Sequence, residues 1–173
     1  MLDRKKNDYY FTIFLNLVRA TYMYLEKDWD NEAQVCGISY AQQHCLWLLH
    51  IQDGLTLTEL GNIAVWNKST TSALVSRLQK KKLVEKRRQK GTNVIRIYLT
   101  KEGWKKIEES INTKECIEFM GLFKDHKEEE VVEILSFLKR IYDEVSKDKN
   151  SDFNRFINEY SENLLKIERG PIV

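Results

Sequence analysis

Residues 56–82 decide the fold, and they read TLTELGNIAVWNKSTTSALVSRLQKKK. Thr56 and Glu59 have the T-x-x-E spacing of a capping box, in which each side chain bonds the backbone amide of the other residue. This spacing predicts the start of a short helix. Asn67 is a favourable N-cap for a second, longer helix. Two helices joined by a turn of about three residues predict a helix-turn-helix.

The pattern changes from helix to strand directly after this motif. Residues 83–88 and 94–99 predict two strands, and the polar residues 89–93 predict the turn between them. Along the second strand, apolar residues such as Ile97 and Leu99 occur at every second position, which is the period of a strand. A β-hairpin directly after a helix-turn-helix predicts a winged helix.

The chain before this module predicts two helices and a polar connection. Residues 8–27 carry apolar side chains at helical spacing on two faces, and such a helix must be covered on two sides. We expect its own domain to cover one side and a partner chain to cover the other. The polar residues 28–37 predict a connection. Ser39 and Gln42 then form another capping box, which opens the next helix.

The chain after the hairpin predicts three further helices. Thr100 caps the first of them, residues 101–123. Apolar stripes at 131–145 and 153–167 mark the other two. The only proline, Pro171, comes after all of them, so nothing before it interrupts a helix by lacking an amide hydrogen. The fold class is therefore mainly α with a small β-hairpin wing.

Charge is segregated along the chain, although the formal net charge of the whole is only +2. Residues 68–106 hold 13 of the 28 basic residues and 2 of the 26 acidic ones, which gives +11. The other 134 residues carry 15 basic and 24 acidic residues, which gives −9. A concentrated positive surface attracts polyanions. The distribution of charge thus favours a nucleic acid as the partner.

The predicted helix 67–82 has two different faces. Its apolar residues Leu74, Val75 and Leu78, together with Thr71, have the spacing of a face that packs on the core. The opposite face is small, polar and cationic and holds no carboxylate, which suits base edges and phosphates. We predict the DNA-binding residues of this helix to be Asn67, Lys68, Ser69, Thr70, Ser72, Ala73, Ser76, Arg77 and Lys80.

The hairpin continues the same basic surface. An isolated basic run is usually a solvated surface, but this one coincides with both a helix-turn-helix pattern and a hairpin. A wing of this kind can follow the DNA backbone and insert a cation into the minor groove. We predict the DNA-binding residues of the wing to be Lys86, Arg87, Arg88, Lys90, Asn93 and Arg96.

Three motifs, in this order, resemble the MarR family of bacterial transcription regulators. They are TLTELGNIA from residue 56, NKSTTSALVSRLQKKKLVEKR from residue 67 and YLTKEG from residue 98. The resemblance covers about residues 10–145. It implies a homodimer that binds pseudo-palindromic operators, with helix 67–82 in the major groove and the wing in the minor groove. The two helices should then meet half-sites about 34–36 Å apart.

The predicted organisation follows from the pattern and the resemblance together. Residues 1–38 supply an N-terminal helix for dimerisation, and residues 39–100 form the winged helix-turn-helix DNA-binding module. Residues 101–173 supply C-terminal helices that link the module to the dimerisation region and form part of it. Two short stretches, 26–29 and 43–47, are similar to the protease-production (Hpr/ScoC) branch of the family.

The sequence departs from the family pattern at two places. Many members have an Asp-x-Arg motif in the wing, but Gly91 and Asn93 stand at the matching positions. Minor-groove contact is therefore expected either from Arg88 or Lys90 or to be weak. Ala73 replaces a longer polar residue that is frequent in relatives. Because of these departures, the preferred operator cannot be transferred from relatives.

Family members often bind phenolic ligands between the dimer helices and the winged module, and some sense oxidants through cysteine. The resemblance thus implies a small aromatic effector, although aromatic residues at helical spacing are more often core. Cys36 is the candidate redox residue, against the alternative of an inert cysteine. The residues that could line an effector pocket are Tyr22, Trp29, Trp47, His50 and Trp104.

Several other classes of protein lack support in the sequence. No apolar run approaches the ~20 residues of a membrane-spanning helix, and no signal peptide is evident, so we expect a cytoplasmic protein. His44, His50 and His126 do not have zinc-ligand spacing, and we expect no metal and no cofactor. No glycine-rich phosphate loop or nucleophile elbow indicates an enzyme.

The leading hypothesis is a homodimeric, sequence-specific regulator of transcription that binds double-stranded DNA, more often a repressor than an activator. A ligand- or redox-responsive form of the same regulator is an alternative within this class. A helical protein–protein interaction module that does not bind DNA is the alternative from another class.

Overall fold

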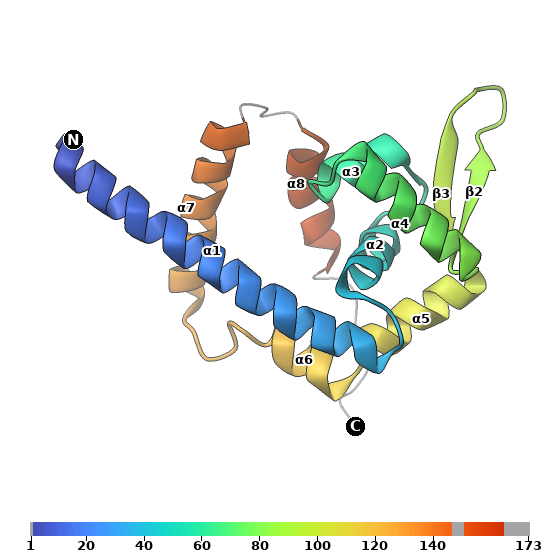
Figure 1. Cartoon of the computed structure of the whole chain (residues 1–173), viewed down its shortest axis with the longest axis horizontal. Coiled ribbons are helices and arrows are strands. Elements are labelled where there is room, and N and C mark those ends of the chain that lie inside the picture. The colour runs from blue at the N-terminus through green and yellow to red at the C-terminus, as the bar shows by residue number, and fades with distance from the viewer. Residues whose placement is uncertain (1, 147–150, 165–173) are drawn as a thin grey trace.

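The computed structural model describes residues 2–146 and 151–164 of the chain (Figure 1). In this part of the chain a long helix, a winged module and a set of C-terminal helices follow one another, which confirms a mainly helical fold with a small wing. The elements in order are α1 Arg4–Val35, α2 Tyr40–Ile51, β1 Leu55–Thr56, α3 Leu57–Ile63, α4 Lys68–Lys80, β2 Val84–Arg88, β3 Ile95–Leu99, α5 Lys101–Ile111, α6 Lys114–Met120, α7 Glu128–Ser146 and α8 Asp152–Leu164.

The helix-turn-helix forms at its predicted position, with the predicted caps. The Thr56 hydroxyl accepts a bond from the Glu59 amide, and the Glu59 carboxylate accepts one from the Thr56 amide at 2.7 Å. At the start of α4 the Asn67 side chain accepts a bond from the Thr70 amide at 2.8 Å. These caps satisfy amides that have no partner within the helix, so they fix where α3 and α4 begin.

The wing contains one strand more than the predicted hairpin. The sheet has the order β1-β3-β2 and is antiparallel throughout, with Leu55 opposite Ile97 and Thr56 opposite Arg96 in β1 and β3. A strand of two residues is too short to show an alternating pattern, so the sequence did not predict it. Beyond β1 only β2 and β3 continue, and they project from the end of the module as a free hairpin (Figure 1).

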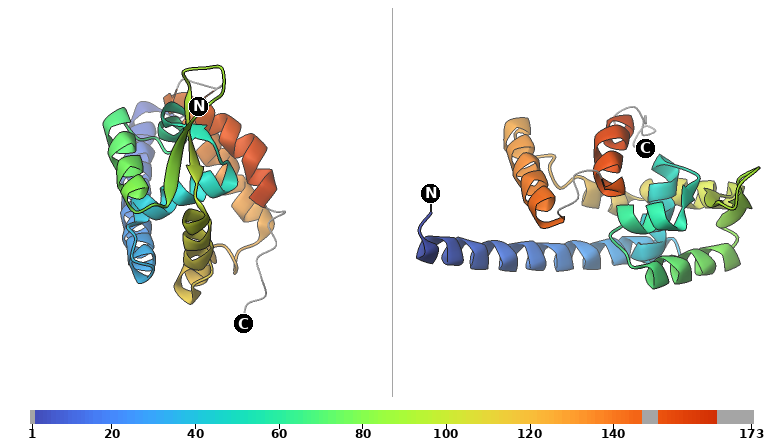
Figure 2. Two further views of the ribbon diagram at one scale, coloured as in Figure 1. Left: turned by 90° about the vertical axis from the view of Figure 1, so that its right-hand side faces the viewer. Right: turned by 90° about the horizontal axis from the view of Figure 1, so that it is seen from above.

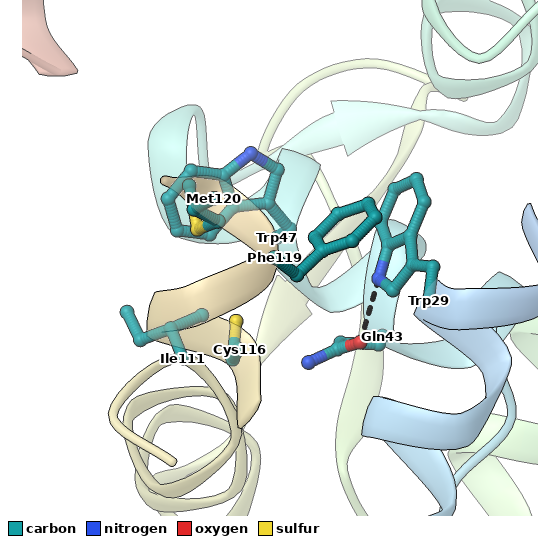
Figure 3. A pocket seen from close by; sticks show the side chains of 7 residues that line it. All are labelled: Trp29, Gln43, Trp47, Ile111, Cys116, Phe119 and Met120. Atoms are coloured by element: carbon teal, nitrogen blue, oxygen red, sulfur yellow. Dashed lines mark hydrogen bonds between the residues drawn. The ribbon is translucent and has the colours of Figure 1, made fainter. Parts of the chain in front are cut away.

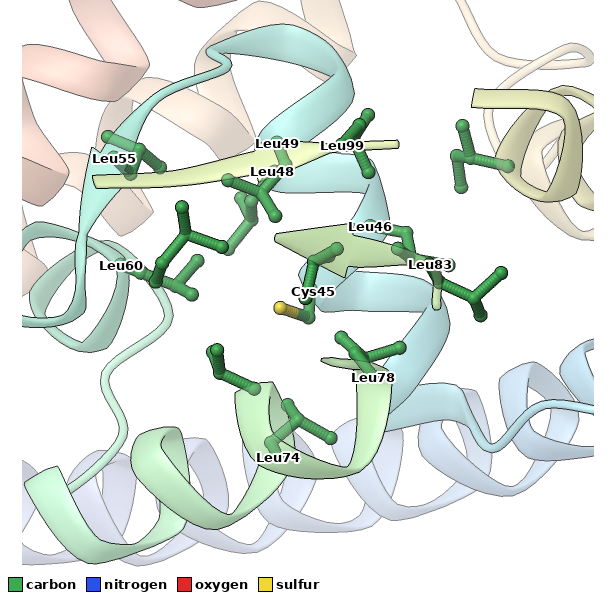
Figure 4. Close-up of a cluster of buried hydrophobic side chains, with 14 of the residues drawn as sticks. Cys45, Leu46, Leu48, Leu49, Leu55, Leu60, Leu74, Leu78, Leu83 and Leu99 are labelled. Carbon is green, nitrogen blue, oxygen red and sulfur yellow. The ribbon is translucent and has the colours of Figure 1, made fainter. Parts of the chain in front are cut away.

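The core lies inside the winged module, where leucines of α2, α3, α4 and the sheet meet (Figure 4). The predicted inner face of α4 is confirmed, because Thr71, Leu74, Val75 and Leu78 are each 5% exposed or less. Burial of one such aliphatic side chain stabilises a fold by about 1.5–3 kcal/mol. The inner face of α4 therefore holds this helix firmly and leaves its other face to solvent.

Helix α1 is longer than predicted, and the expected polar connection at 28–37 was wrong. The helix runs on to Val35 and ends in a Schellman motif, with Ile38 N bonded to Ala33 O and Gly37 N bonded to Gln34 O. Gly37 takes the left-handed conformation that this motif requires, at φ 70°. The polar residues near the end of α1 continue the helix because its other side packs on α2.

The predicted helix 101–123 is divided into α5 and α6. The Asn112 side chain bonds the Glu108 carbonyl at 2.8 Å and ends α5. The Thr113 hydroxyl accepts a bond from the Cys116 amide at 3.1 Å and opens α6. These two polar side chains compete with the helix backbone, and apolar spacing alone did not reveal the break.

The helices α1 and α7 extend away from the winged module, whereas α8 packs against it (Figure 2). Phe14 of α1 and Phe137 of α7 meet edge to face, with ring centroids 6.4 Å apart. The Asn62 amide of α3 donates a bond to the Asp152 carboxylate of α8 at 2.8 Å, and Phe156 of α8 is buried in the core. The last part of the predicted stripe, including Ile167, lies outside the described residues.

Within those residues, none of the helices combines the length and the apolar character needed to cross a membrane.

Candidate nucleic-acid interface

The outer side of α4 is a surface without carboxylates, which we call the recognition face. Most of its residues are exposed, and the two serines Ser72 and Ser76 are half-buried. Asn67 caps the helix and also accepts a bond from the Ser69 hydroxyl at 2.6 Å, while the Ser76 hydroxyl bonds the Ser72 carbonyl. The residues of the recognition face are Asn67, Lys68, Ser69, Thr70, Ser72, Ala73, Ser76, Arg77 and Lys80.

The cations of the recognition face are available to a ligand. Lys68, Arg77 and Lys80 are exposed, and their side chains form no hydrogen bond or ion pair with any described residue. Lys81, by contrast, bonds the Gly37 carbonyl at 3.2 Å and the Gln42 side chain at 3.3 Å, which ties the end of α4 to the start of α2. The recognition face is thus a rigid helix surface that carries unpaired positive charge.

The structure divides the predicted wing residues into two groups. Arg87 pairs with the Glu85 carboxylate and lies over the Tyr98 ring, 4.8 Å from its centroid. Arg96 bonds the Gly54 carbonyl at 2.8 Å and also pairs with a carboxylate of α3. Both arginines therefore have partners within the protein.

The other wing cations have no such partners. Lys86 is half-buried, Arg88 and Lys90 are exposed, and none of the three forms an ion pair within residues 2–146 and 151–164. Asn93 is exposed in the turn next to Gly91, which has φ 77°. Sequence reasoning could not separate the two groups, because the partners of Arg87 and Arg96 depend on how the strands pair.

The predicted effector residues fall into two neighbouring clusters. Tyr22, Trp29 and Trp47 line an apolar groove of about 700 Å³ between α1, α2, the end of α3, α6 and α8. His50 and Trp104 lie outside it, where the His50 ring stacks on Trp47 at 5.8 Å and meets Trp104 at 5.1 Å. Only Trp47 belongs to both clusters.

A smaller apolar cavity of about 130 Å³ adjoins the groove and shares Trp29, Trp47 and Phe119 with it (Figure 3). The Trp29 indole donates a bond to the buried Gln43 side chain at 2.6 Å, which holds one wall in place. An engineered apolar cavity of about 150 Å³ binds benzene. Phe119 was missed because α6 was predicted as part of one longer helix.

His44 is the titratable group most affected by this groove. Its ring lies between Trp29, with centroids 4.9 Å apart, and Trp66, at 5.4 Å. Burial lowers the pKa of His44 to about 4 from the usual 6.5. As the pH falls below about 6.5, the unfolded chain binds a proton at this position before the folded chain does, so folding becomes less favourable down to about pH 4.

We therefore expect the free energy of unfolding to fall by about 2 kcal/mol from His44 alone between pH 7 and pH 5. Urea denaturation of the wild type and of His44→Phe at both pH values measures this effect. The variant should lose about 2 kcal/mol less than the wild type over this range. An equal loss in both proteins would contradict the assignment.

The three cysteines are thiols in different surroundings. Cys36, the candidate redox residue, is half-buried at the C-terminal end of α1. Cys45 is buried in the core, and burial raises the pKa of its thiol to about 12, which disfavours the reactive thiolate. Cys116 is buried beside the small cavity. Among the described residues, no group of three His, Cys, Asp or Glu side chains could hold a metal ion.

Fold and surface together define a winged helix-turn-helix protein with an exposed, carboxylate-free face on α4. Residues 38–91, which run from the start of α2 to the wing turn, match the model of the MarR family. This part of the chain is therefore similar to the winged helix-turn-helix module of the MarR family. A comparison with curated protein sequences found no significant match.

Solved structures of transcription regulators have the same fold. A MarR family protein from Bacillus stearothermophilus is 24% identical, with a TM-score of 0.63 over 84% of this chain and 99% of that chain. S. aureus MepR, solved as a complex with DNA, is 25% identical, with a TM-score of 0.67 over 75% and 94%. An organohalide-sensing transcriptional regulator bound to 2,4-dichlorophenol is 18% identical, with a TM-score of 0.64 over 83% and 86%.

Proposed function

We propose that this protein is a cytoplasmic, homodimeric repressor of transcription that binds pseudo-palindromic operators in double-stranded DNA. The observation that carries the proposal is the recognition face of α4, which is exposed, lacks carboxylates and bears unpaired cations beside those of the wing. Hydroxyl and methyl groups on such a face can meet base edges, and its cations can meet guanine or phosphate. The complex of MepR with DNA supports this function by similarity of fold.

The homodimer is supported by apolar surface that the chain leaves uncovered. Along α1, large apolar side chains such as Phe11, Leu15 and Leu17 are more than half exposed, and α7 has no buried residue. Exposed apolar surface of this extent marks an interface. We propose that residues 1–38 and 101–173 of two chains pair through it, with the modules 39–100 at the ends.

Selection of bound duplexes followed by fluorescence anisotropy tests this function. We expect binding of two chains per selected duplex, with log affinity falling by about 0.9 per log unit of salt for each phosphate neutralised. A size measurement of the free protein should give a dimer. If the wild type binds no duplex at low salt, the proposal is wrong and an interaction module without DNA binding becomes the better explanation.

A small aromatic effector is a second proposal, and it rests on the groove and its adjoining cavity. Both are lined by Trp29, Trp47 and Phe119, and their apolar walls suit a ring compound. A relative of the same fold was solved with 2,4-dichlorophenol. Titration of 2,4-dichlorophenol against tryptophan fluorescence tests it, and an unchanged signal at saturating ligand would contradict it.

Two narrower proposals concern ancestry and redox response. The stretches 26–29 and 43–47, which suggest the protease-production branch, adjoin in the fold through the bond from Trp29 to Gln43.

A redox response through Cys36 would need its half-buried thiol to react with an oxidant. Loss of operator affinity on peroxide treatment, restored by thiol reductant and absent in Cys36→Ser, would support that response.

A further inference from the structure

Arg96 differs from the other wing cations in how completely its side chain is bonded. Its guanidinium donates a bond to the Gly54 carbonyl at 2.8 Å and another to the Gln89 side chain at 3.0 Å. The same group pairs with the Glu59 carboxylate at 3.5 Å. Only about a third of the side chain is exposed. A guanidinium presents its donors in a fixed planar fork, so three acceptors at once hold it in one orientation.

The three partners of Arg96 belong to different parts of the module. Gly54 precedes β1, Glu59 is the residue of α3 that completes its capping box, and Gln89 begins the turn of the wing. Burial raises the pKa of Glu59, but its bonds with Thr56 and the charge of Arg96 outweigh burial and lower it overall. The carboxylate thus stays ionised and available to the arginine at neutral pH.

The position of Arg96 in the sheet makes these bonds important for the wing. Arg96 stands opposite Thr56, the last residue of β1, and opposite Arg87 in β2. Beyond this point the hairpin consists of two strands only, and an isolated two-stranded hairpin is marginally stable in water. The bond with Gln89 connects Arg96 to a residue seven positions earlier in the chain, in the part of the hairpin that does not pair with β1.

We propose that Arg96 is a positioning residue that fixes the wing relative to α3, and that it does not bind phosphate. This inference rests on the proposed DNA-binding function, within which the wing must reach the groove next to the one occupied by α4. Arg88 supplies the contrast, because it is exposed and has no ion pair with a described residue. Arg88 meets DNA directly, and Arg96 aims the hairpin that carries it.

The first test measures the wing without DNA, by hydrogen exchange of the amides in residues 89–94 of the full chain. We expect Glu59→Gln to speed exchange in the wing by about tenfold relative to α4, the size expected for loss of one charged hydrogen bond, and Arg96→Gln, which removes all three bonds, to speed it at least as much. Arg88→Gln should leave it unchanged. Glu59→Gln is the sharper variant, because glutamine preserves the capping box and the substituted side chain does not touch the wing turn. Unchanged exchange in both variants would overturn the proposal.

The second test measures the salt dependence of duplex binding. Arg88→Gln should reduce the slope of log affinity against log salt by about 0.9 for each phosphate that Arg88 neutralises in the wild type. Arg96→Gln should weaken binding at every salt concentration and leave the slope as in the wild type. Because both changes break one pair, Glu59→Gln combined with Arg96→Gln should weaken binding no more than Arg96→Gln alone.

The outcomes separate this inference from the proposed function. A wild type that binds no duplex refutes DNA binding, while the exchange experiment still decides whether Arg96 holds the wing. A wild type that binds, with Arg96→Gln reducing the slope as Arg88→Gln does, makes Arg96 a phosphate-binding residue and overturns the positioning role. Additive losses for Glu59→Gln and Arg96→Gln overturn it as well.

Discussion

Ala73→Glu is expected to reduce affinity for the selected duplex by about 100-fold or more. Ala73 is exposed on α4, two residues beyond the buried Thr71, near the middle of the recognition face. A carboxylate at this position would face phosphates and base edges, and like charges brought together in an interface cost several kcal/mol. In a dimer the substitution enters both half-sites. The same anisotropy titration measures the loss.

Gln79→Glu provides a control with the same change of charge on the same helix. Gln79 is exposed but lies about 120° around α4 from Ala73 and about 9 Å further along the helix axis, by the helical spacing of about 100° and 1.5 Å per residue. We expect a loss of affinity below about threefold, from long-range repulsion alone. Helix content by circular dichroism should be the same in both variants. If both variants bind equally well, or lose affinity equally, α4 does not read DNA.

Much of the winged module could be predicted from the sequence because its signals are local. Capping boxes act over three residues, and they located α2 and α3 correctly through Ser39 and Thr56. The buried face of α4 follows from the periodicity of its own residues, such as Leu74 and Leu78, and once that face is known the recognition face is its complement.

Features that depend on distant partners could not be predicted in this way. The pairing of β1 with β3 joins residues about 40 positions apart, and the bond from Arg96 to Gly54 spans the same separation because it follows from that pairing. Arg96 and Arg88 look alike in the sequence, yet only the fold brings Glu59 next to one of them. The groove likewise needs Phe119 and Phe153, whose helices are separated from Trp29 by most of the chain.

Gly103→Ala is expected to destabilise the fold by about 3 kcal/mol or more, as the overpacking of a closely packed site does. Gly103 is buried in the first turn of α5, where a Cβ atom would overlap the carbonyl oxygen of Leu83 and lie 3.2 Å from the Leu99 side chain. Neither neighbour can move freely. The Leu83 carbonyl already accepts a bond from the Thr100 amide at 3.1 Å, and Leu99 is part of the core.

The Thr100 cap explains why α5 cannot shift away to make room. Its hydroxyl accepts a bond from the Gly103 amide at 3.0 Å and donates one to the Lys82 carbonyl at 2.7 Å. Thr100 therefore forms a junction between the start of α5 and the residues that precede β2. Relief of the overlap would break this junction, which joins α5 to the base of the wing. Urea denaturation measures the loss of stability, and we expect a lower midpoint with a similar slope.

Gly37→Ala separates close packing from backbone conformation, the two reasons for which a glycine can be required. Gly37 has φ 70°, and a Cβ atom there would meet no atom within 4 Å, so only the left-handed conformation is penalised. That cost is about 1 kcal/mol. Gly103 has no positive φ, so its larger loss must come from the overlap with Leu83. Equal losses in the two variants would show that α5 yields at this point, and the start of α5 would then be a flexible joint between the winged module and the C-terminal helices.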